Sequence, residues 1–302
     1  MSQLRRIVPP AGRGRGNDRP ERDSGREVGD ETALDGEPEQ GDFFDHPLYL
    51  RTVRAERSDA ASTEEALAAA RLVSCKPGAL ILDAGCGNGR HALPLARVGY
   101  RVVAFDRSEL LLAAGRRSAG RARWPRFVRG CYASLPFRTG RFDAILSLGT
   151  ALGYLGDHGD QRALYEFRRV LIPGGRLVIE TLHREELEAH LVAEEERALP
   201  RGATLRLERR FDPRRGALHE TQRLRDDTGW GPARAYEMRV YGVSELSSML
   251  RRARFGHVEC YGSLEGGGEP TPMTPLVLVA HTRAPGPPDR ALHAPRANDE
   301  NV

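Results

Sequence analysis

Hydrophobic and polar positions along the middle of the chain follow two alternating periods, which predict strands and helices in turn. Short apolar runs with the length of buried strands occur at 80–82, 102–105, 126–129, 142–148 and 176–181. Segments with the apolar spacing of helices lie among them, at 90–98, 109–118 and 161–171. Strands and helices that alternate at this spacing predict an α/β fold, a parallel sheet with helices on both faces.

Two helices are expected before the first strand. Residues 43–57 have a helical pattern, and Ser62-Thr63-Glu64-Glu65 has the capping-box order that starts a second helix. Both helices would therefore precede the alternating unit.

The regular alternation ends after His183, where an antiparallel insert is predicted over about 184–241. A helix over about 184–197 is expected first, followed by strands at 204–211, 217–225 and 233–241. The run Asp212-Pro213-Arg214-Arg215-Gly216 has the residues of a hairpin turn between the first two strands. The elements expected to complete the domain are a helix from Val243 and an antiparallel hairpin at the sheet edge, with strands at 257–261 and 275–281.

The two ends of the 302-residue chain are expected to be disordered tails. Residues 1–41 hold few apolar side chains among many Arg, Gly, Pro, Asp and Glu, and residues 284–302 are polar and rich in Pro. Such segments cannot bury enough apolar surface to order themselves. The overall hydrophobic content of 39% supports a core in the remaining segment, 42–283, which is predicted to be one domain with its insert.

Composition also narrows the expected compartment and partners. No apolar stretch approaches the length of a membrane span and no signal-peptide pattern is present, so we expect a cytoplasmic protein with no membrane partner. The four cysteines form no C-x-x-C pair, so neither a metal site nor a disulfide framework is predicted. The formal charge of +4 is mild for this size and does not by itself indicate a nucleic-acid partner.

The most informative segment joins an apolar strand, an acid and three glycines. Asp83 ends the strand, and Gly85, Gly87 and Gly89 follow at alternate positions before a helix. Glycine permits positive φ and a close approach of the backbone to a ligand, so this order predicts a nucleotide-cofactor loop. The dinucleotide fingerprint needs a third small residue where this chain has Arg90, which argues against NAD.

Asp106 supports the same site from the next strand. It lies about 20 residues beyond the first glycine, where its carboxylate can accept hydrogen bonds from both hydroxyls of a ribose. NAD and S-adenosylmethionine (SAM) share this ribose, so Asp106 is consistent with both cofactors. The plain alternative is an acid at a helix N-terminus, since Ser108 and Glu109 open the next helix.

Six motifs in order along the chain resemble the class I SAM-dependent methyltransferases. They are Asp83-Ala-Gly-Cys-Gly-Asn-Gly-Arg-His91, Val103-Ala-Phe-Asp106, Leu135-Pro-Phe137, Phe142-Asp143, Gly153-Tyr154-Leu155 and Leu171-Ile-Pro-Gly-Gly175. The resemblance covers about 43–283 and indicates members with an antiparallel insert after the fifth strand. It implies a Rossmann-like, seven-stranded doubly wound sheet with an antiparallel last strand, and SAM as the cofactor.

The resemblance also implies a cofactor site. Asp83 and the glycine loop would hold the methionine end of SAM, Asp106 the ribose, and Cys131 and Tyr132 would lie beside the adenine. The candidate cofactor-binding residues are Tyr49, Asp83, Gly85, Cys86, Gly87, Gly89, Arg90, Asp106, Arg107, Cys131, Tyr132, Leu148 and Gly149. At Cys131 the family usually has an acid that accepts from the adenine amino group. A thiol is a weak acceptor, so we expect SAM to bind up to about tenfold more weakly.

Candidate catalytic residues follow strands four and five. SAM carries an activated methyl group, so the protein mainly has to align a nucleophile with it and exclude water. The crevice residues expected at these strand ends are Gly149, Thr150, Tyr154, Glu180, Thr181 and His183. His183 is the most plausible general base, and Tyr154 is a candidate for orienting the acceptor. The alternatives are a surface histidine at a helix start and a tyrosine packed beneath the loop.

The insert is where substrate choice is expected to reside, as a lid or wall over the transferred methyl group. Apolar members such as Leu205, Leu207 and Leu218 are expected to be buried beneath it. The insert arginines are Arg206, Arg209, Arg210, Arg214, Arg215, Arg223 and Arg225. Alternate strand residues face solvent, so most are expected on a solvated face, and the remainder would suit an acidic small substrate.

Together these patterns predict a SAM-dependent methyltransferase that acts on an N or O nucleophile of a small molecule. The loop after the fourth strand lacks the Asn/Asp-Pro-Pro-Tyr sequence of enzymes that methylate exocyclic amines of nucleic acids or glutamine, and no Pro-Cys pair for cytosine C5 chemistry occurs. Two alternatives remain open. They are a non-catalytic SAM-binding module, and an RNA methyltransferase that uses the basic tail and insert.

Overall fold

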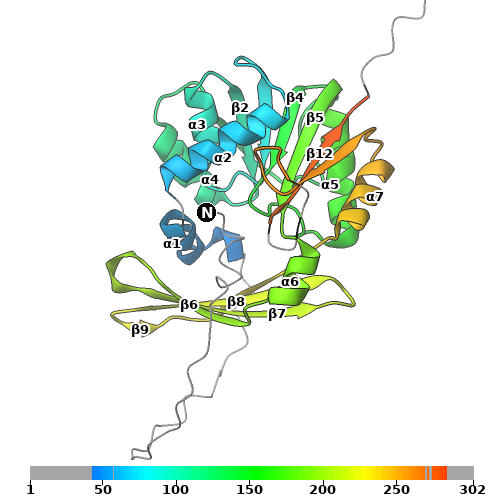
Figure 1. The fold of residues 1–302 in the computed structure, drawn as a ribbon. Helices are drawn as coiled ribbons and strands as arrows, with labels where there is room; N and C mark the ends of the chain where they lie inside the picture. Colours follow the sequence, from blue (N-terminus) through cyan, green and yellow to red (C-terminus); the bar gives the residue numbers. More distant parts are fainter. Residues whose placement is uncertain (1–42, 57, 269–270, 272–273, 284–302) are drawn as a thin grey trace, which may run out of the picture.

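The computed structural model describes residues 43–56, 58–268, 271 and 274–283. The predicted tails, 1–41 and 284–302, lie outside these described residues. Two β-sheets with surrounding helices build the described part of the chain (Figure 1).

A seven-stranded sheet forms the main body, in the order β11-β12-β5-β4-β1-β2-β3. Its strands are β1 (Leu80–Ala84), β2 (Arg101–Asp106), β3 (Arg126–Arg129), β4 (Phe142–Ser147), β5 (Leu171–Thr181), β11 (Val258–Tyr261) and β12 (Leu276–His281). Strands β1 to β5 pair in parallel, and β12 pairs antiparallel with both β5 and β11. The predicted Rossmann-like sheet with an antiparallel last strand is confirmed.

Helices cover both faces of this sheet because successive strand residues feed opposite cores. The helices are α2 (Asp59–Leu72), α3 (Ala92–Arg97), α4 (Glu109–Ala119), α5 (Gly156–Val170) and α7 (Val243–Arg252). Leu80 and Leu82 of β1 belong to the core under α5 and α7, whereas Ile81 belongs to the core under α2 and α3. All three leucine and isoleucine side chains are buried, which explains why β1 reads as an uninterrupted apolar run.

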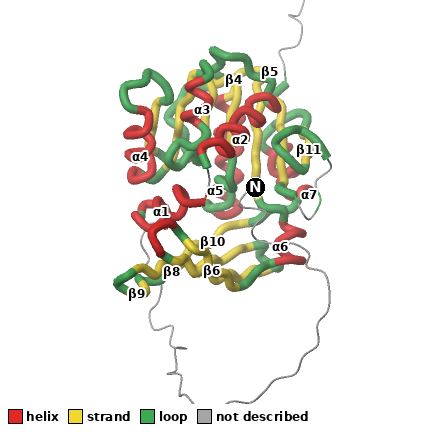
Figure 2. The backbone as a smooth tube through the Cα atoms, turned by 60° about the vertical axis from the view of Figure 1, so that its left-hand side comes forward, coloured by secondary structure: helices red, strands yellow, loops and turns green. Residues whose placement is uncertain are grey.

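The insert forms a second, antiparallel sheet below the main one in Figure 1. Its strands are β6 (Glu194–Ala198), β7 (Thr204–Asp212), β8 (Ala217–Asp226), β9 (Gly229–Trp230) and β10 (Arg234–Arg239), in the order β10-β8-β7-β6 with β9 paired to β8. Figures 1 and 2 show α1 (Pro47–Glu56) and α6 (Arg184–His190) between the two sheets. A short 3₁₀ helix, η2 (Phe43–Asp45), precedes α1. Leu205, Leu207 and Leu218 are buried, as expected.

Several predicted element boundaries are wrong, among them the start of β5, which begins at Leu171 and not at Arg176. The helix expected over 184–197 ends at His190, because residues Glu194–Ala198 pair with β7 and complete the insert sheet as β6. Helix α2 begins before Ser62, because the Ser58 hydroxyl accepts the Ala61 amide and caps the helix there. Helix α5 begins at Gly156 instead of Gln161, so the loop after β4 is shorter than expected.

Candidate functional site

Two adjoining cavities lie at the carboxyl ends of the main strands, and the second is also lined by the insert sheet. The first contains about 670 Å³ of empty space, part of it open to solvent, and the second contains about 720 Å³. Both values include space that is open to solvent. The residues that line both cavities are Phe44, Tyr49, Gly149, Thr150 and Tyr154. The two cavities therefore meet at these five residues, which we call the junction.

The glycine loop after β1 forms one wall of the first cavity. Gly85 and Gly87 line the cavity with φ values of 80° and 55°, in the left-handed region. A Cβ atom at Gly85 would lie 2.5 Å from the Cβ of Ala151 in the loop after β4. Only glycine lets these two loops approach so closely.

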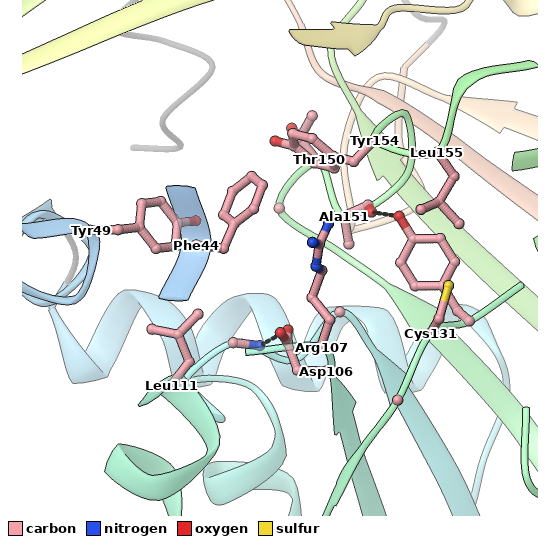
Figure 3. Close-up of a pocket in the computed structure, with 15 residues that line it drawn as sticks. Phe44, Tyr49, Asp106, Arg107, Leu111, Cys131, Thr150, Ala151, Tyr154 and Leu155 are labelled. Carbon is pink, nitrogen blue, oxygen red and sulfur yellow. Dashed lines mark hydrogen bonds between the residues drawn. The ribbon is translucent and has the colours of Figure 1, made fainter. Parts of the chain in front are cut away.

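Asp106 ends β2 and faces the first cavity (Figure 3). Its Oδ2 accepts the Gly87 amide at 2.7 Å, and its Oδ1 accepts the Ser108 amide at 2.9 Å. Burial raises the pKa of Asp106, although these amide hydrogen bonds act in the opposite direction. Each oxygen keeps a second lone pair, so the carboxylate can still accept hydrogen bonds from a bound polyol.

Asp83 lies behind the glycine loop and is not part of either cavity lining. The residue is 1% exposed, and burial raises its pKa to about 7 while Arg90 opposes that rise. Its Oδ2 atom has no hydrogen-bond partner among the described residues. A buried carboxylate oxygen without a donor fits a cationic or N–H-bearing ligand group near this loop.

Arg90 lies outside both cavity linings and packs against Gly149, one of the junction residues. Its Nη1 donates to Glu65 of α2 at 2.5 Å, and a Cβ atom at Gly149 would lie 2.7 Å from its Nη2.

The predicted cofactor-binding residues divide into two groups by position. The candidates outside both linings are Asp83, Cys86, Gly89, Arg90 and Leu148. Those within the first lining are Tyr49, Gly85, Gly87, Asp106, Arg107, Cys131, Tyr132 and Gly149. The structure therefore brings eight of the predicted residues to one cavity, and their roles stay predictions.

Cys131 and Tyr132 reach the first cavity from the loop after β3. The Tyr132 hydroxyl donates to the Ala151 carbonyl at 2.9 Å, and burial raises its pKa (Figure 3). Tyr132 thus ties the loop after β3 to the loop after β4. The Cys131 thiol is exposed, so it remains available at this end of the cavity.

The two predicted catalytic residues lie in different surroundings. Tyr154 lines both cavities, and burial raises the pKa of its phenol well above the usual value, so the hydroxyl stays protonated. His183 is 7% exposed at the start of α6, where its Nδ1 lies 3.1 Å from Glu185 Oε2. It lies outside both cavity linings, so this geometry offers no support for the predicted base.

A buried polar network lines the second cavity beneath the insert. Arg209 is 4% exposed; its Nε donates to Glu220 Oε2 at 2.5 Å and its Nη1 to Glu195 Oε2 at 2.9 Å. Glu220 Oε1 accepts from Gln222 Nε2 at 2.7 Å and from the Tyr236 hydroxyl at 3.1 Å. Arg209 is therefore an exception to the expected solvated face. The exposed insert arginines are Arg210, Arg214, Arg215 and Arg225.

Sequence reasoning missed most of the second cavity. The missed lining residues are Phe44, Thr52, Leu182, Arg197, Glu220, Gln222, Tyr236 and Met238. Strand alternation over 217–226 does place Leu218, Glu220 and Gln222 on one face. Nothing local shows that this face meets Thr150, which lies about 70 residues earlier in another sheet's loop.

Two further observations concern the described residues only. None of their helices has the length and apolarity needed to cross a membrane. Within the same residues, His, Cys, Asp and Glu side chains form no group of three placed to hold a metal ion. The cytoplasmic location stays a prediction.

Residues 81–175 match the methyltransferase domain family. The chain is 35% identical over 121 residues to a probable tRNA methyltransferase 9B of Homo sapiens, covering 38% of this chain and 24% of that protein. It is 37% identical over 113 residues to a demethylmenaquinone methyltransferase of Clavibacter sepedonicus, covering 37% of this chain and 45% of that protein. The chain thus spans less than half the length of these curated relatives.

Solved structures extend the likeness beyond the matched domain. The CcbJ methyltransferase of Streptomyces caelestis superposes with a TM-score of 0.64 at 25% identity, covering 76% of this chain and 93% of that one. The SAM-bound CalS10 amino pentose methyltransferase of Micromonospora echinaspora superposes with a TM-score of 0.58 at 22% identity, covering 78% of this chain and 97% of that one. The second likeness concerns the fold. Both cover about three quarters of this chain.

Proposed function

We propose that this chain, which carries a SAM-dependent methyltransferase domain, transfers the methyl group of SAM to an amine nitrogen of a small molecule. The observation that carries the proposal is the junction, where two cavities meet at five shared residues. SAM would occupy the first cavity and the acceptor the second. The methyl group would then cross between them beside Thr150 and Tyr154.

The residues of the first cavity fit SAM. Gly85 and Gly87 let the backbone approach the ligand, and Asp106 keeps lone pairs for the ribose hydroxyls. Asp83 lies behind the glycine loop and outside this lining, and its unpartnered oxygen would suit the ammonium group at the methionine end. When bound, SAM supplies a methyl group already activated on a sulfonium, so a nucleophile with a free lone pair can displace it directly.

The ionisable groups around the junction favour an amine over an alcohol. An alcohol must lose a proton to a base, whereas a neutral amine attacks with its lone pair and releases a proton afterwards. Glu220 of the second cavity is already held by Arg209, and the Tyr154 phenol stays protonated. Neither group is suited to act as that base.

Aromatic rings around the junction suit the charge that an amine acquires. The Phe44 and Tyr154 ring centroids lie 4.8 Å apart, and those of Tyr154 and Tyr236 lie 5.7 Å apart. Phe44 and Tyr49 are 5.0 Å apart (Figure 3). Positive charge that develops on a methylated nitrogen is stabilised by such ring faces. CalS10, which has the same fold, is described as an amino pentose methyltransferase, so an amine-bearing substrate is known for this fold.

Two measurements test the proposal. Calorimetry with SAM, S-adenosylhomocysteine and NAD should show binding of the first two only, and NAD binding without SAM would contradict the assignment. A methyl-transfer assay over amines, phenols and carboxylic acids, with S-adenosylhomocysteine as the product measured, should give turnover of amines. Tight SAM binding without turnover of any compound in the panel would favour a non-catalytic SAM-binding module.

An RNA acceptor is a second candidate because of one surface on the insert. Trp230 is 37% exposed, with the Arg223 and Arg225 guanidinium carbons 5.8 and 5.2 Å from its ring centroid. Stacked arginine and tryptophan side chains suit single-stranded nucleic acid. This candidate predicts a gel shift with RNA at low salt that weakens steeply as salt rises. Absence of any shift at low salt would remove it.

A further inference from the structure

We propose that the acceptor amine also carries a hydroxyl or a second N–H group and no carboxylate, and that Gln222 selects it by accepting that hydrogen. This inference rests on the proposed function and narrows its substrate class. It assigns Gln222 as a specificity residue of the second cavity, which Gln222 lines from β8.

The orientation of the Gln222 amide is fixed by its neighbour. Gln222 is 7% exposed, and its Nε2 donates to Glu220 Oε1 at 2.7 Å. An ionised carboxylate only accepts hydrogen bonds, so the amide nitrogen must face Glu220 and the amide oxygen must point elsewhere. That Oε1 atom is buried and has no hydrogen-bond partner among the described residues. Because Gln222 belongs to the cavity lining, we infer that a ligand donor is the partner that this oxygen lacks.

Glu220 acts as the positioning residue of this arrangement. Its two oxygens already accept from Gln222, from Tyr236 and from the Arg209 guanidinium, at 2.7, 3.1 and 2.5 Å. With three protein donors in place, Glu220 holds the lining side chains in fixed directions. The acceptor of this network that lacks a protein donor is the Gln222 oxygen.

The charges of the second cavity disfavour an acidic acceptor. Its two arginines each have a carboxylate partner, since Arg197 Nε and Nη2 donate to Glu195 at 2.6 and 2.8 Å and Arg209 bridges Glu195 and Glu220. Two guanidinium groups thus face two carboxylates, with no surplus positive charge in this set. A ligand carboxylate would have to break these ion pairs. This argues against the expectation from the sequence that the insert arginines not facing solvent would suit an acidic small substrate.

A wholly apolar acceptor is disfavoured by the same wall. It would leave the buried Gln222 oxygen without a donor, and sites with buried polar groups reject analogues that lack the matching group. The wall does contain apolar side chains, Leu207, Leu218 and Met238, which suit the carbon skeleton of a ring. The chemistry of the cavity therefore matches a hydroxylated cyclic amine.

A matched set of three ring amines tests the inference. The probes are trans-4-aminocyclohexanol, cyclohexylamine and trans-4-aminocyclohexanecarboxylic acid, which differ in one substituent. Binding to the protein saturated with S-adenosylhomocysteine is measured by ligand-observed NMR, and methyl transfer is measured with SAM. The variants are Gln222→Leu, Glu220→Gln and Thr221→Val. Thr221 is the adjacent β8 residue on the opposite, partly exposed face and serves as the control.

We expect the wild-type protein to bind the aminocyclohexanol about tenfold more tightly than cyclohexylamine, with the carboxylic acid weakest. Gln222→Leu should remove the preference for the hydroxyl, and Glu220→Gln should reduce it by releasing the amide. Thr221→Val should keep it, and all three variants should bind SAM within about twofold of the wild type.

Three results would overturn the inference while leaving the proposed function in place, provided that the wild-type protein still binds SAM. They are a preference for the carboxylic acid, a hydroxyl preference that survives Gln222→Leu, and no binding by any of the three probes. Loss of SAM binding by the wild-type protein would instead overturn the proposed function itself.

Discussion

The Tyr241 hydroxyl donates a 2.8 Å hydrogen bond to the buried carboxyl group of Asp160. Tyr241 follows β10 at the end of the insert, and Asp160 lies in the first turns of α5, where it also accepts the Gly153 amide at 3.3 Å. One carboxyl group therefore ties the insert to the loop that carries Thr150 and Tyr154. The two walls of the second cavity are fixed relative to each other through this contact.

The burial of Asp160 makes stability depend on pH, and the hydrogen bond from Tyr241 opposes this effect. Burial raises the pKa of Asp160 from 3.8 to about 6, so the fold favours the neutral carboxyl. That stabilisation is present below pH 3.8 and is lost as pH rises through about 6, a difference of about 3 kcal/mol. Relative to Asp160→Asn, the free energy of unfolding of the wild type should fall by up to that amount between pH 4 and pH 7.5.

Urea unfolding at several pH values measures this difference. Glu109→Gln is the control, because Glu109 lies on α4, another helix, with its side chain 46% exposed. The free energy of unfolding of the control should change with pH in parallel with that of the wild type. Parallel curves for Asp160→Asn as well would show that the Asp160 proton is not coupled to folding.

Asp106 should dominate recognition of the ribose. Asp106→Ala removes charge-assisted hydrogen bonds and should weaken SAM binding by about 1–3 kcal/mol in calorimetry. Asp106→Asn keeps one acceptor oxygen and should lose less. The control is Glu109→Ala, an exposed acid at the start of the next helix that pairs with Arg116. Unchanged affinity in Asp106→Ala would mean that the ribose lies elsewhere.

Asp83 should give SAM binding its own pH dependence. Burial raises its pKa to about 7, so the free protein holds a neutral carboxyl at pH 6 and a carboxylate at pH 8. The carboxylate is the form that attracts an ammonium group, so affinity should rise by about tenfold over this range, with proton release on binding. Calorimetry in buffers of different ionisation enthalpy detects that proton.

Asp83→Asn removes the titrating group and should make the affinity nearly independent of pH between 6 and 8. If the wild type already showed a flat profile, the ammonium group would not lie near Asp83. A slope that persisted in Asp83→Asn would assign the titration to another group, such as Asp106, whose pKa is also raised by burial.

Filling the second cavity should stop turnover without disturbing SAM. Leu207 lines that cavity and is 1% exposed, so Leu207→Trp would project a larger ring into the acceptor space. We expect turnover to fall at least about tenfold while the SAM affinity stays within about twofold. Arg206→Trp places the same ring on the other face of β7 and should leave turnover unchanged. Full activity of a folded Leu207→Trp protein would move the acceptor site elsewhere.

Much of the fold follows from local sequence. The apolar run that ends at Asp83, the glycines after it and the second run that ends at Asp106 specify a strand, a turn and a strand by backbone preference and periodicity. The helix predicted over 184–197 extends too far, since Glu194–Ala198 forms strand β6. The charged residues of this segment have no apolar period that would distinguish a strand from a helix. Its strand conformation comes from pairing with β7, which no local pattern contains.

The part of the site expected to bind the cofactor could also be predicted from the sequence. Its motif residues follow parallel strands whose carboxyl ends meet at one edge of the sheet. The tertiary structure alone decided which residues reach the cavities. It set Arg90 against Glu65 and left His183 outside both linings. It also brought Gln222 to the wall opposite Thr150, because the packing of one sheet on another depends on distant contacts and not on local periodicity.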